Sequence, residues 1–343
     1  MHLRRLFRVF GFPCLAAVLT FAGCGDSEKS ASRAVEKSRY VFISNGVAQF
    51  WTIAEAGAKQ ASKELGVDVG IYMPGSLTEQ KQMLEDALTR GCAGVAVSPI
   101  DPANQTEMLD EVAAVTNLIT HDSDAPASKR RAYIGMDNYS AGRMCGKLVK
   151  EALPNGGEVM ILIGRMEQDN SRKRRQGVMD ELLGRSEDST RFDAPGDQVE
   201  GGGFRILGTL TDAFDFAKAK ANAEDTLSRY PEIDAMIGLF AYNPPAILQA
   251  LEQAGKLKTV KVIGFDEDDG TLEGIRSGAV YGTVVQNPYE YGYQSVQVLH
   301  ALARGDASVV PHDAFIHIPG RQIRKDTVEA FWSELKKRVG TKP

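Results

Sequence analysis

The chain has 343 residues, of which 43% are hydrophobic and 25% are charged, so it is long enough for two domains and has the composition of a globular protein. Its formal net charge is −5. Because an acidic chain repels phosphate backbones, nucleic acid is excluded as an expected partner.

The first 23 residues predict a secretory signal peptide. Three arginines precede an apolar run over 9–21, and Ala22 and Gly23 lead to Cys24. The run is short for a membrane span. The setting of Cys24 resembles a bacterial lipoprotein cleavage site, where the cysteine is lipidated and becomes the first mature residue; plain secretion and a retained anchor are the alternatives. Removing residues 1–23 changes the net charge from −5 to −8.

A tether and then a regular alternation of elements follow. Residues 24–38 are polar, which predicts a flexible tether between a membrane and a folded domain. The strands predicted next are 40–44, 68–72, 93–98 and 117–120, and the helices between them are 50–65, 77–90 and 102–114. Strands that alternate with helices of this length predict right-handed βαβ units and a parallel sheet.

The alternation restarts after residues 133–135 and gives a second module of similar size. Its predicted strands are 158–163, 206–210, 234–239, 260–263, 281–285 and 315–318, and its predicted helices are 139–153, 171–183, 214–229, 245–254, 269–277, 288–304 and 331–339. The glycine-rich stretch 184–204 is too long for an ordinary connection, so we expect a surface excursion there.

One stretch, residues 261–288, places polar groups at strand ends. A buried strand ends in Gly264-Phe265-Asp266, and the next strand ends in Gln286 before Pro288. Because ligands of open α/β sheets lie outside the carboxyl ends of the strands, these side chains are candidate ligand contacts.

Further landmarks occur in a fixed order along the chain. They are the pair Phe50-Trp51, Asp122 after a strand, Asp137-Asn138-x-x-x-Gly142-Arg143, Arg174-x-x-Gly177, Gly264-Phe265-Asp266 and Gln286. In this order, over roughly residues 39–339, the chain resembles periplasmic sugar-binding proteins of the ribose-binding type, the substrate receptors of ATP-driven importers.

The resemblance implies an α/β protein with two doubly wound parallel-sheet lobes joined by a three-strand hinge, the type I fold of periplasmic binding proteins. It implies an N-terminal lobe of residues 39–136 and 287–316 and a C-terminal lobe of residues 137–286 and 317–343. The lobes would close on a small sugar or polyol. The expected partner is the membrane permease of an ABC importer, and the expected state is a periplasmic monomer; docking to a membrane sensor or chemoreceptor is the alternative.

Sugar chemistry and the resemblance together suggest the roles of the site residues. Carboxylates and amides bind hydroxyl groups, and aromatic rings cover the C–H faces of a sugar. Asp122 and Asp266 would accept hydroxyl hydrogen bonds, and Arg174 would donate to ligand oxygens. The ligand set predicted in this way is Asn45, Phe50, Trp51, Asp122, Asp137, Arg174, Phe214, Phe240, Asn243, Asp266 and Gln286.

Structural roles compete with these assignments. An aspartate at a strand end is often a helix cap, and Asp268 and Asp269 are expected to be caps. Arg174 lies in a run of four basic residues, which is usually a solvated helix face. Ser123 stands where the family often has arginine, and Phe240 where the ribose receptor has asparagine, so we do not expect ribose itself as the ligand.

Other classes of function lack their motifs. The sequence has no Gly-x-Ser-x-Gly elbow, no Gly-x-Gly-x-x-Gly after the first strand and no His-rich metal spacing, so we expect no enzyme, cofactor or metal site. A DNA-binding repressor would need an N-terminal helix-turn-helix, where this chain has a signal. His121 is expected to be structural, and Cys92 and Cys145 are expected to be buried thiols.

Overall fold

The computed structural model describes residues 39–340, so the predicted signal peptide, tether and Cys24 lie outside the described residues. The helices are α1 (Gln49–Leu65), α2 (Leu77–Thr89), α3 (Pro102–Val115), α4 (Asn138–Ala152), α5 (Asp169–Leu182), α6 (Phe216–Arg229), α7 (Asn243–Gln253), α8 (Asp269–Ser277), α9 (Pro288–Ala303) and α10 (Val328–Val339). The strands are β1 (Arg39–Ile43), β2 (Asp68–Tyr72), β3 (Gly94–Val97), β4 (Asn117–His121), β5 (Ala132–Gly135), β6 (Gly157–Ile163), β7 (Val199–Gly201), β8 (Phe204–Thr211), β9 (Ala235–Gly238), β10 (Lys261–Phe265), β11 (Gly282–Val285), β12 (Phe315–His317) and β13 (Arg321–Arg324).

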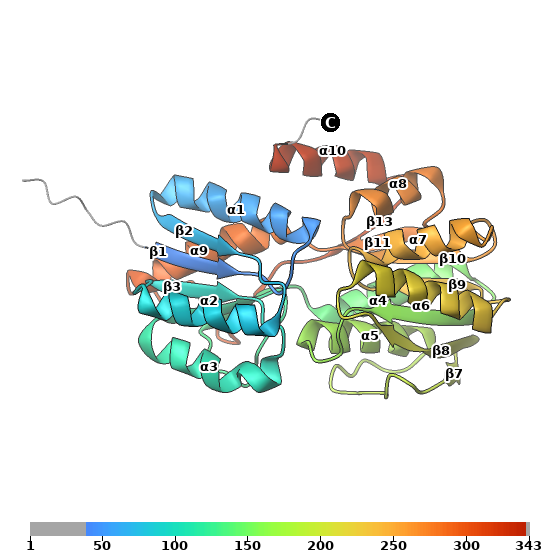
Figure 1. Ribbon diagram of the computed structural model, residues 1–343, viewed down its shortest axis with the longest axis horizontal. Helices are drawn as coiled ribbons and strands as arrows, with labels where there is room; N and C mark the ends of the chain where they lie inside the picture. The colour runs from blue at the N-terminus through green and yellow to red at the C-terminus, as the bar shows by residue number, and fades with distance from the viewer. Residues whose placement is uncertain (1–38, 341–343) are drawn as a thin grey trace, which may run out of the picture. The chain divides into compact units, whose positions relative to one another are not determined.

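The strands form two sheets, which confirms the predicted fold class of two α/β lobes (Figure 1). The first sheet has the order β12-β5-β4-β3-β1-β2 and is parallel throughout. The second has the order β13-β11-β10-β9-β6-β8-β7, with a parallel centre and one antiparallel strand at each edge. The chain passes between the sheets three times, from β5 to α4, from β11 to α9 and from β12 to β13.

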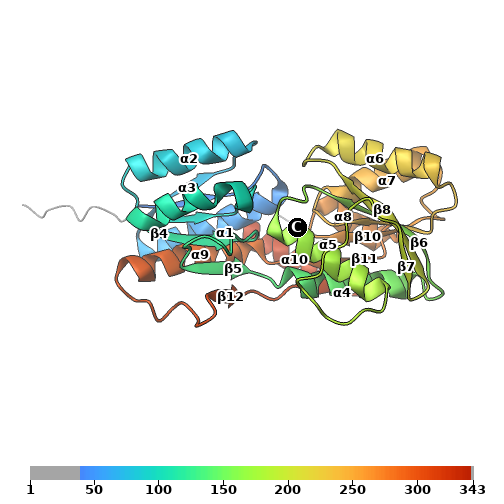
Figure 2. The ribbon, with the colours of Figure 1, turned by 90° about the horizontal axis from the view of Figure 1, so that it is seen from below.

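Alternating side chains attach helices to both faces of the first sheet. Helices α1 and α9 cover one face of this sheet, and α2 and α3 cover the other (Figures 1 and 2). On β1, Tyr40 and Phe42 pack with α1 and α9, whereas Val41 and Ile43 pack with α2 and α3. The run is apolar at every position after Arg39 because both faces of a parallel sheet are covered.

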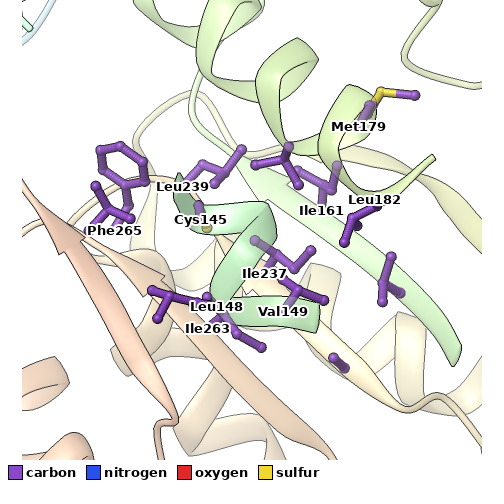
Figure 3. Packing of buried hydrophobic residues seen from close by; sticks show 14 of the residues in the cluster. Cys145, Leu148, Val149, Ile161, Met179, Leu182, Ile237, Leu239, Ile263 and Phe265 are labelled. Carbon is purple, nitrogen blue, oxygen red and sulfur yellow. The ribbon is translucent and has the colours of Figure 1, made fainter. Parts of the chain in front are cut away.

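The second sheet is covered in the same way. Val159 and Ile161 of β6 pack with α4 and α5, a cluster shown in Figure 3, and Met160 and Leu162 pack with α6, α7 and α8. Helix α10 contacts α1 on one side and α8 on the other (Figure 1). Both sheets therefore have buried centres, and their carboxyl-end loops remain available for a site.

Three strands were not predicted, and each carries a weak signal. β13 has one buried side chain, Ile323, between polar ones, and it joins the sheet edge as an antiparallel strand. β7 has three residues at the other edge, inside the excursion predicted over 184–204. β5 is only four residues long. β7 and β13 lie at sheet edges and lack the apolar periodicity on which prediction depends, whereas β5 is buried between β4 and β12 and is too short for a periodic pattern. Cys92 and Cys145 are free and buried, as predicted.

Two glycine pairs let helices approach closely. A Cβ atom on Gly142 of α4 would overlap the carbonyl of Arg174 in α5, and a Cβ atom on Gly177 would overlap the carbonyl of Tyr139. Gly57 of α1 and Gly292 of α9 make the same kind of contact in the first lobe. Gly142 and Gly177 thus allow α4 and α5 to pack with their backbones in direct contact.

Replacing Gly177 with alanine is expected to lower the free energy of unfolding by about 2–3 kcal/mol, because the added methyl group must push two helix backbones apart. Urea denaturation would measure the loss. Gly196→Ala is the matched control, since nothing lies within 4 Å of a Cβ atom there, and it should change stability by less than about 0.5 kcal/mol. Equal stabilities of the two variants would contradict the close contact.

Candidate functional site

The carboxyl-end loops of both sheets surround one cavity of about 220 Å³. The first lobe contributes the loop after β1, the start of α1 and the residue after β4. The second lobe contributes the loops after β8, β9 and β10, and Gln286 lies on the passage from β11 to α9. Eight of the eleven predicted ligand residues line the cavity: Asn45, Phe50, Trp51, Asp122, Phe214, Phe240, Asp266 and Gln286.

Asp122 supplies a buried carboxylate from the first lobe. It follows β4 and has a φ of 57°, a left-handed conformation that aspartate tolerates better than most residues. Its Oδ2 atom accepts hydrogen bonds from Asn45 Nδ2 (3.2 Å), Ser98 Oγ (3.1 Å) and Asn170 Nδ2 (3.2 Å). Since Asn170 belongs to α5, this carboxylate links the two lobes.

Asp266 holds the corresponding place in the second lobe. It follows β10 and has a φ of 67°. Its Oδ1 atom accepts a hydrogen bond of 2.7 Å from Gln286 Nε2, and Gln286 Oε1 accepts one of 3.0 Å from the hydroxyl of Tyr291. The two aspartates therefore end a strand in each lobe with the same backbone conformation, and both line the cavity.

Burial changes the proton affinity of both carboxyl groups. It raises the pKa of Asp122 to about 6, although the positive charge of Arg174 opposes the shift, and Asp266 adds to it. Burial also raises the pKa of Asp266, against the charge of Arg174 and the hydrogen bond from Gln286. The carboxylates are thus weakly solvated acceptors that a ligand's hydroxyl groups could satisfy.

We expect ligand affinity to fall about tenfold between about pH 7.5 and about pH 5, because a group with a pKa of about 6 is mostly protonated at the lower value. The apo protein should respond in the opposite sense. The folded-state pKa of Asp122 (about 6) lies above its unfolded value, so its contribution lowers stability as the pH rises from about 4 to about 6. Titration calorimetry at several pH values would measure the affinity.

Asp122→Asn is the control for this pH dependence. The variant should bind more weakly, with a flatter pH profile, and the charged groups that remain near the site include Asp266, Asp268, Asp212 and Arg174. An unchanged profile in the variant would assign the titration to another group.

Arg174 lies behind the cavity wall and does not line it. Its side chain is fully buried. Its Nη1 atom donates to the carbonyl of Leu239 (2.8 Å), and its Nη2 atom donates to Asn138 Oδ1 (2.9 Å). The guanidinium carbon is 3.9 Å from the ring centroid of Phe265 and 5.2 Å from that of Phe240. Arg174 therefore supports the wall and balances the two carboxylates from behind.

The neighbouring Arg175 also departs from the usual solvated helix face. Arg175 is fully buried, and it donates to Thr209 Oγ1 (2.6 Å) and to the carbonyl of Asp193 (2.7 Å). Asp193 lies in the stretch 184–204 and also bonds Arg185. The predicted surface excursion is thus attached to the lobe through buried charges.

Aromatic rings make the remaining walls. In the second lobe, the rings of Phe214, Phe240 and Tyr242 contact one another with centroids 5.3–6.4 Å apart. In the first lobe, Phe50 meets Trp51 edge to face at 4.8 Å. Both sets line the cavity, so aromatic surface is available on each side of a ligand.

Asp212 and Asn243 hold the second-lobe rings in place. Asn243 Nδ2 donates to Asp212 Oδ2 (2.8 Å), and Asn243 Oδ1 accepts from the amide of Phe240 (3.0 Å). Asp212 also accepts hydrogen bonds from the amide of Phe214 and the hydroxyl of Tyr242. Burial raises the pKa of Asp212 to about 6.

Two further predicted residues, like Arg174, lie outside the cavity lining. Asn243 is fully buried behind the rings, with both polar atoms engaged, and lies outside the cavity lining. Asp137 is exposed and caps α4 by accepting from the amides of Tyr139 and Ser140. We leave these two residues and Arg174 out of the proposed ligand set. Asn138, the neighbour of Asp137, is the residue that reaches Arg174.

Prediction from sequence missed Asn170 and the second role of Asp268. Asn170 lies four residues before Arg174 on α5, a spacing that puts both on one helix face. Asp268 caps α8, as predicted, and also lines the cavity. His121 is buried with its ring stacked on Phe42 at 4.1 Å, as expected of a structural residue.

Within residues 39–340, neither a metal site nor a membrane-spanning helix was found. The acidic, cysteine and histidine side chains of this part form no group of three that could hold a metal ion. None of its helices combines the length and the apolar character that crossing a membrane requires.

Comparison with known proteins identifies similar chains. Residues 40–307 match the family described as periplasmic binding protein domain. The D-allose-binding periplasmic protein of Escherichia coli is 25% identical over 281 residues, which are 77% of this chain and 83% of that protein. The ribose import binding protein RbsB of Bacillus subtilis is 24% identical, over 75% of this chain and 78% of that protein.

Solved structures of sugar-binding proteins are also similar to this chain. GanP, a glucose-galactose binding protein from Geobacillus stearothermophilus, is 26% identical with a TM-score of 0.75, and the comparison covers 85% of this chain and 98% of GanP. An ABC transporter solute binding protein from Burkholderia graminis, solved with D-arabinose, is 25% identical with a TM-score of 0.77 and covers 85% of this chain and 97% of its own.

Proposed function

The chain belongs to the periplasmic binding protein domain family, and from this premise we propose that it captures a small sugar or polyol between its lobes and delivers it to an ABC importer. The relatives named for ribose import and for allose binding support this choice of cargo and destination. The observation that carries the proposal is the cavity itself, where each lobe presents one buried aspartate beside aromatic rings.

Each part of the cavity suits a polyhydroxylated molecule. A carboxylate accepts two hydroxyl hydrogen bonds, and Asp122 and Asp266 together could hold several hydroxyl groups. Hydrogen bonds to charged groups contribute about 1.5–3 kcal/mol each. The rings of Trp51 and Phe214 come from opposite lobes and could cover the two apolar faces of one sugar ring. The affinity would come from hydrogen bonds to the hydroxyl groups of the sugar and from aromatic contacts with the two faces of its ring.

Binding would also close the two lobes. The hydrogen bond from Asn170 to Asp122 joins the two lobes, and the cavity is lined by residues of both lobes, such as Asn45 and Asp266. A ligand that touches both lobes favours the arrangement in which they are close, since only there are all its contacts made. The closed form is then the one that a permease would recognise.

Isothermal titration with pentoses, hexoses and polyols tests this function. We expect one or more ligands to bind with a Kd in the micromolar range or tighter. Heat from binding that disappears in Asp122→Asn would connect it to the cavity. If no sugar or polyol gave heat under conditions where the protein is folded, the carbohydrate function would be wrong.

The same proposal places the protein outside the cytoplasmic membrane, anchored as a monomer through Cys24. The signal-like run and the small residues before Cys24 support the anchor. Globomycin, which blocks the lipoprotein signal peptidase, should make the uncleaved precursor accumulate in expressing cells. Cys24→Ser is the control, since it should prevent lipidation without the drug. Normal processing in the presence of globomycin would exclude the anchor.

The proposed function requires no covalent chemistry. Asp122 is held by three amide and hydroxyl donors, and Asp266 by Gln286, so both are fixed as hydrogen-bond acceptors. The sensor alternative would use the same cavity with a different docking partner. Import is favoured because the relatives named above include an import binding protein.

A further inference from the structure

Two large apolar side chains are exposed at the mouth of the cavity. Among residues 39–340, the large hydrophobic side chains that are exposed are Val47, Val115, Phe192, Phe216 and Tyr281. Val47, 74% exposed, and Phe216, 39% exposed, both line the cavity, and they come from opposite lobes. Single exposed hydrophobic residues are common on any protein, but two at one opening point to an apolar contact.

Polarity changes from the inner end of the cavity to its mouth. Of the polar lining residues, Asn45, Asp122, Asp266 and Gln286 are buried, whereas Asp268 is half-buried and Gln49 is exposed. The rings of Phe214, Phe240 and Tyr242 are half-buried, and the exposed Val47 and Phe216 come last. A molecule that fills such a cavity has hydroxyl groups at one end and apolar surface at the other.

Phe216 is not needed to fix its own helix. The core-facing residues of α6 are Ala219, Ala223 and Leu227, and Phe216 continues this stripe one turn beyond them. At this position Phe216 faces the cavity, whereas the buried residues of α6 face the sheet. Val47 lies in the loop between β1 and α1 and has no core position. Neither side chain has a partner among the buried clusters of the described residues.

The charged side chains of the cavity lining limit which substituents a bound sugar could carry. The cavity lining contains three carboxylates, Asp122, Asp266 and Asp268, and no lysine, arginine or histidine. It therefore offers no cation to a phosphate or carboxylate group on a sugar, and it would repel such a group. A neutral apolar substituent fits the mouth.

We propose that the ligand of this chain is a glycoside with an aromatic or aliphatic aglycone, which lies between Val47 and Phe216 while its sugar occupies the inner end of the cavity. This inference rests on the proposed function. The two lobes would then each contribute one aglycone contact, so the substituent would also favour closure.

Matched glycosides test the inference. The parent sugar that binds best in titration is compared with its methyl and phenyl glycosides in both anomeric forms, so that the two differ only in the size of the apolar group. For one anomer, the phenyl glycoside should bind at least about tenfold more tightly than the methyl glycoside, as expected when an aromatic ring leaves water.

Variants locate the effect. Phe216→Ser and Val47→Ser should each remove most of the phenyl advantage and leave the Kd of the parent sugar unchanged. Val115→Ser, an exposed apolar residue outside the cavity, is the control and should keep the advantage.

The possible outcomes separate this inference from the proposed function. If the parent sugar binds but no glycoside does, or if phenyl and methyl glycosides bind equally, the aglycone site is wrong and sugar binding stands. A phenyl advantage that survives both variants would also overturn the site. If neither sugars nor glycosides bind, the proposed function itself fails.

Discussion

Replacing Asp266 with alanine is expected to weaken sugar binding at least tenfold and up to about a hundredfold. The variant loses charged hydrogen bonds worth about 1.5–3 kcal/mol to ligand hydroxyl groups. It also releases the amide of Gln286, which donates to Asp266 Oδ1 at 2.7 Å. Asp266 is buried and accepts hydrogen bonds from the side chain of Gln286 and the backbone of Ala241, which leaves acceptor capacity for ligand hydroxyl groups.

The stability of Asp266→Ala should change little. Burial raises the pKa of Asp266, which means that the ionised carboxyl group opposes folding near neutral pH, and its removal offsets the cost of placing alanine at a φ of 67°. Titration calorimetry gives the affinity and thermal unfolding the stability. Asp137→Ala is the control, because this exposed helix cap should keep wild-type affinity. Wild-type binding by Asp266→Ala would remove Asp266 from the site.

Replacing Arg174 with methionine should damage both folding and binding. Its guanidinium holds the carbonyl of Leu239 and Asn138 Oδ1 and stacks on Phe265, and all these groups are buried. Removing one partner from such a buried polar network costs on the order of 3 kcal/mol. Because Arg174 has no place in the cavity lining, its effect on affinity would be indirect.

That indirect effect has a measurable signature. The charge of Arg174 lowers the pKa of both Asp122 and Asp266, so the methionine variant should need a higher pH to reach full affinity. Urea denaturation and calorimetry across pH would show the two changes. Arg172→Met, an exposed neighbour in the same basic run, is the control and should alter neither. An unshifted pH profile with reduced stability would leave Arg174 a purely structural residue.

The sequence predicts most of the inner cavity because strand ends are easy to recognise. Asp122 and Asp266 each follow a short apolar run, and parallel strands bring such ends to one edge. Phe240 directly follows a predicted strand in the same way, whereas Phe214 was predicted to open a helix. A polar residue directly after an apolar strand is a local pattern, so it can be recognised from each strand by itself.

Residues that act across distance could not be predicted in this way. Arg174 was expected to touch the ligand, but its direction is decided by Asn138 and Leu239, which approach it from other elements. Asn170 meets Asp122 only after two lobes come together. Asn243 looked like a cavity residue, yet Asp212 holds it behind the rings. Such partners are set by tertiary packing and leave no periodic pattern.

The glycine contacts between α4 and α5, and between α1 and α9, also bear on how this protein could be re-engineered. Where backbones touch directly there are no rotamers to rearrange, so each lobe keeps its geometry when surrounding residues are exchanged. The cavity lies instead on loops, which tolerate substitution. A biosensor designer could therefore alter the loops after β1 and β8 to choose a new analyte and read it out through the lobe closure proposed above.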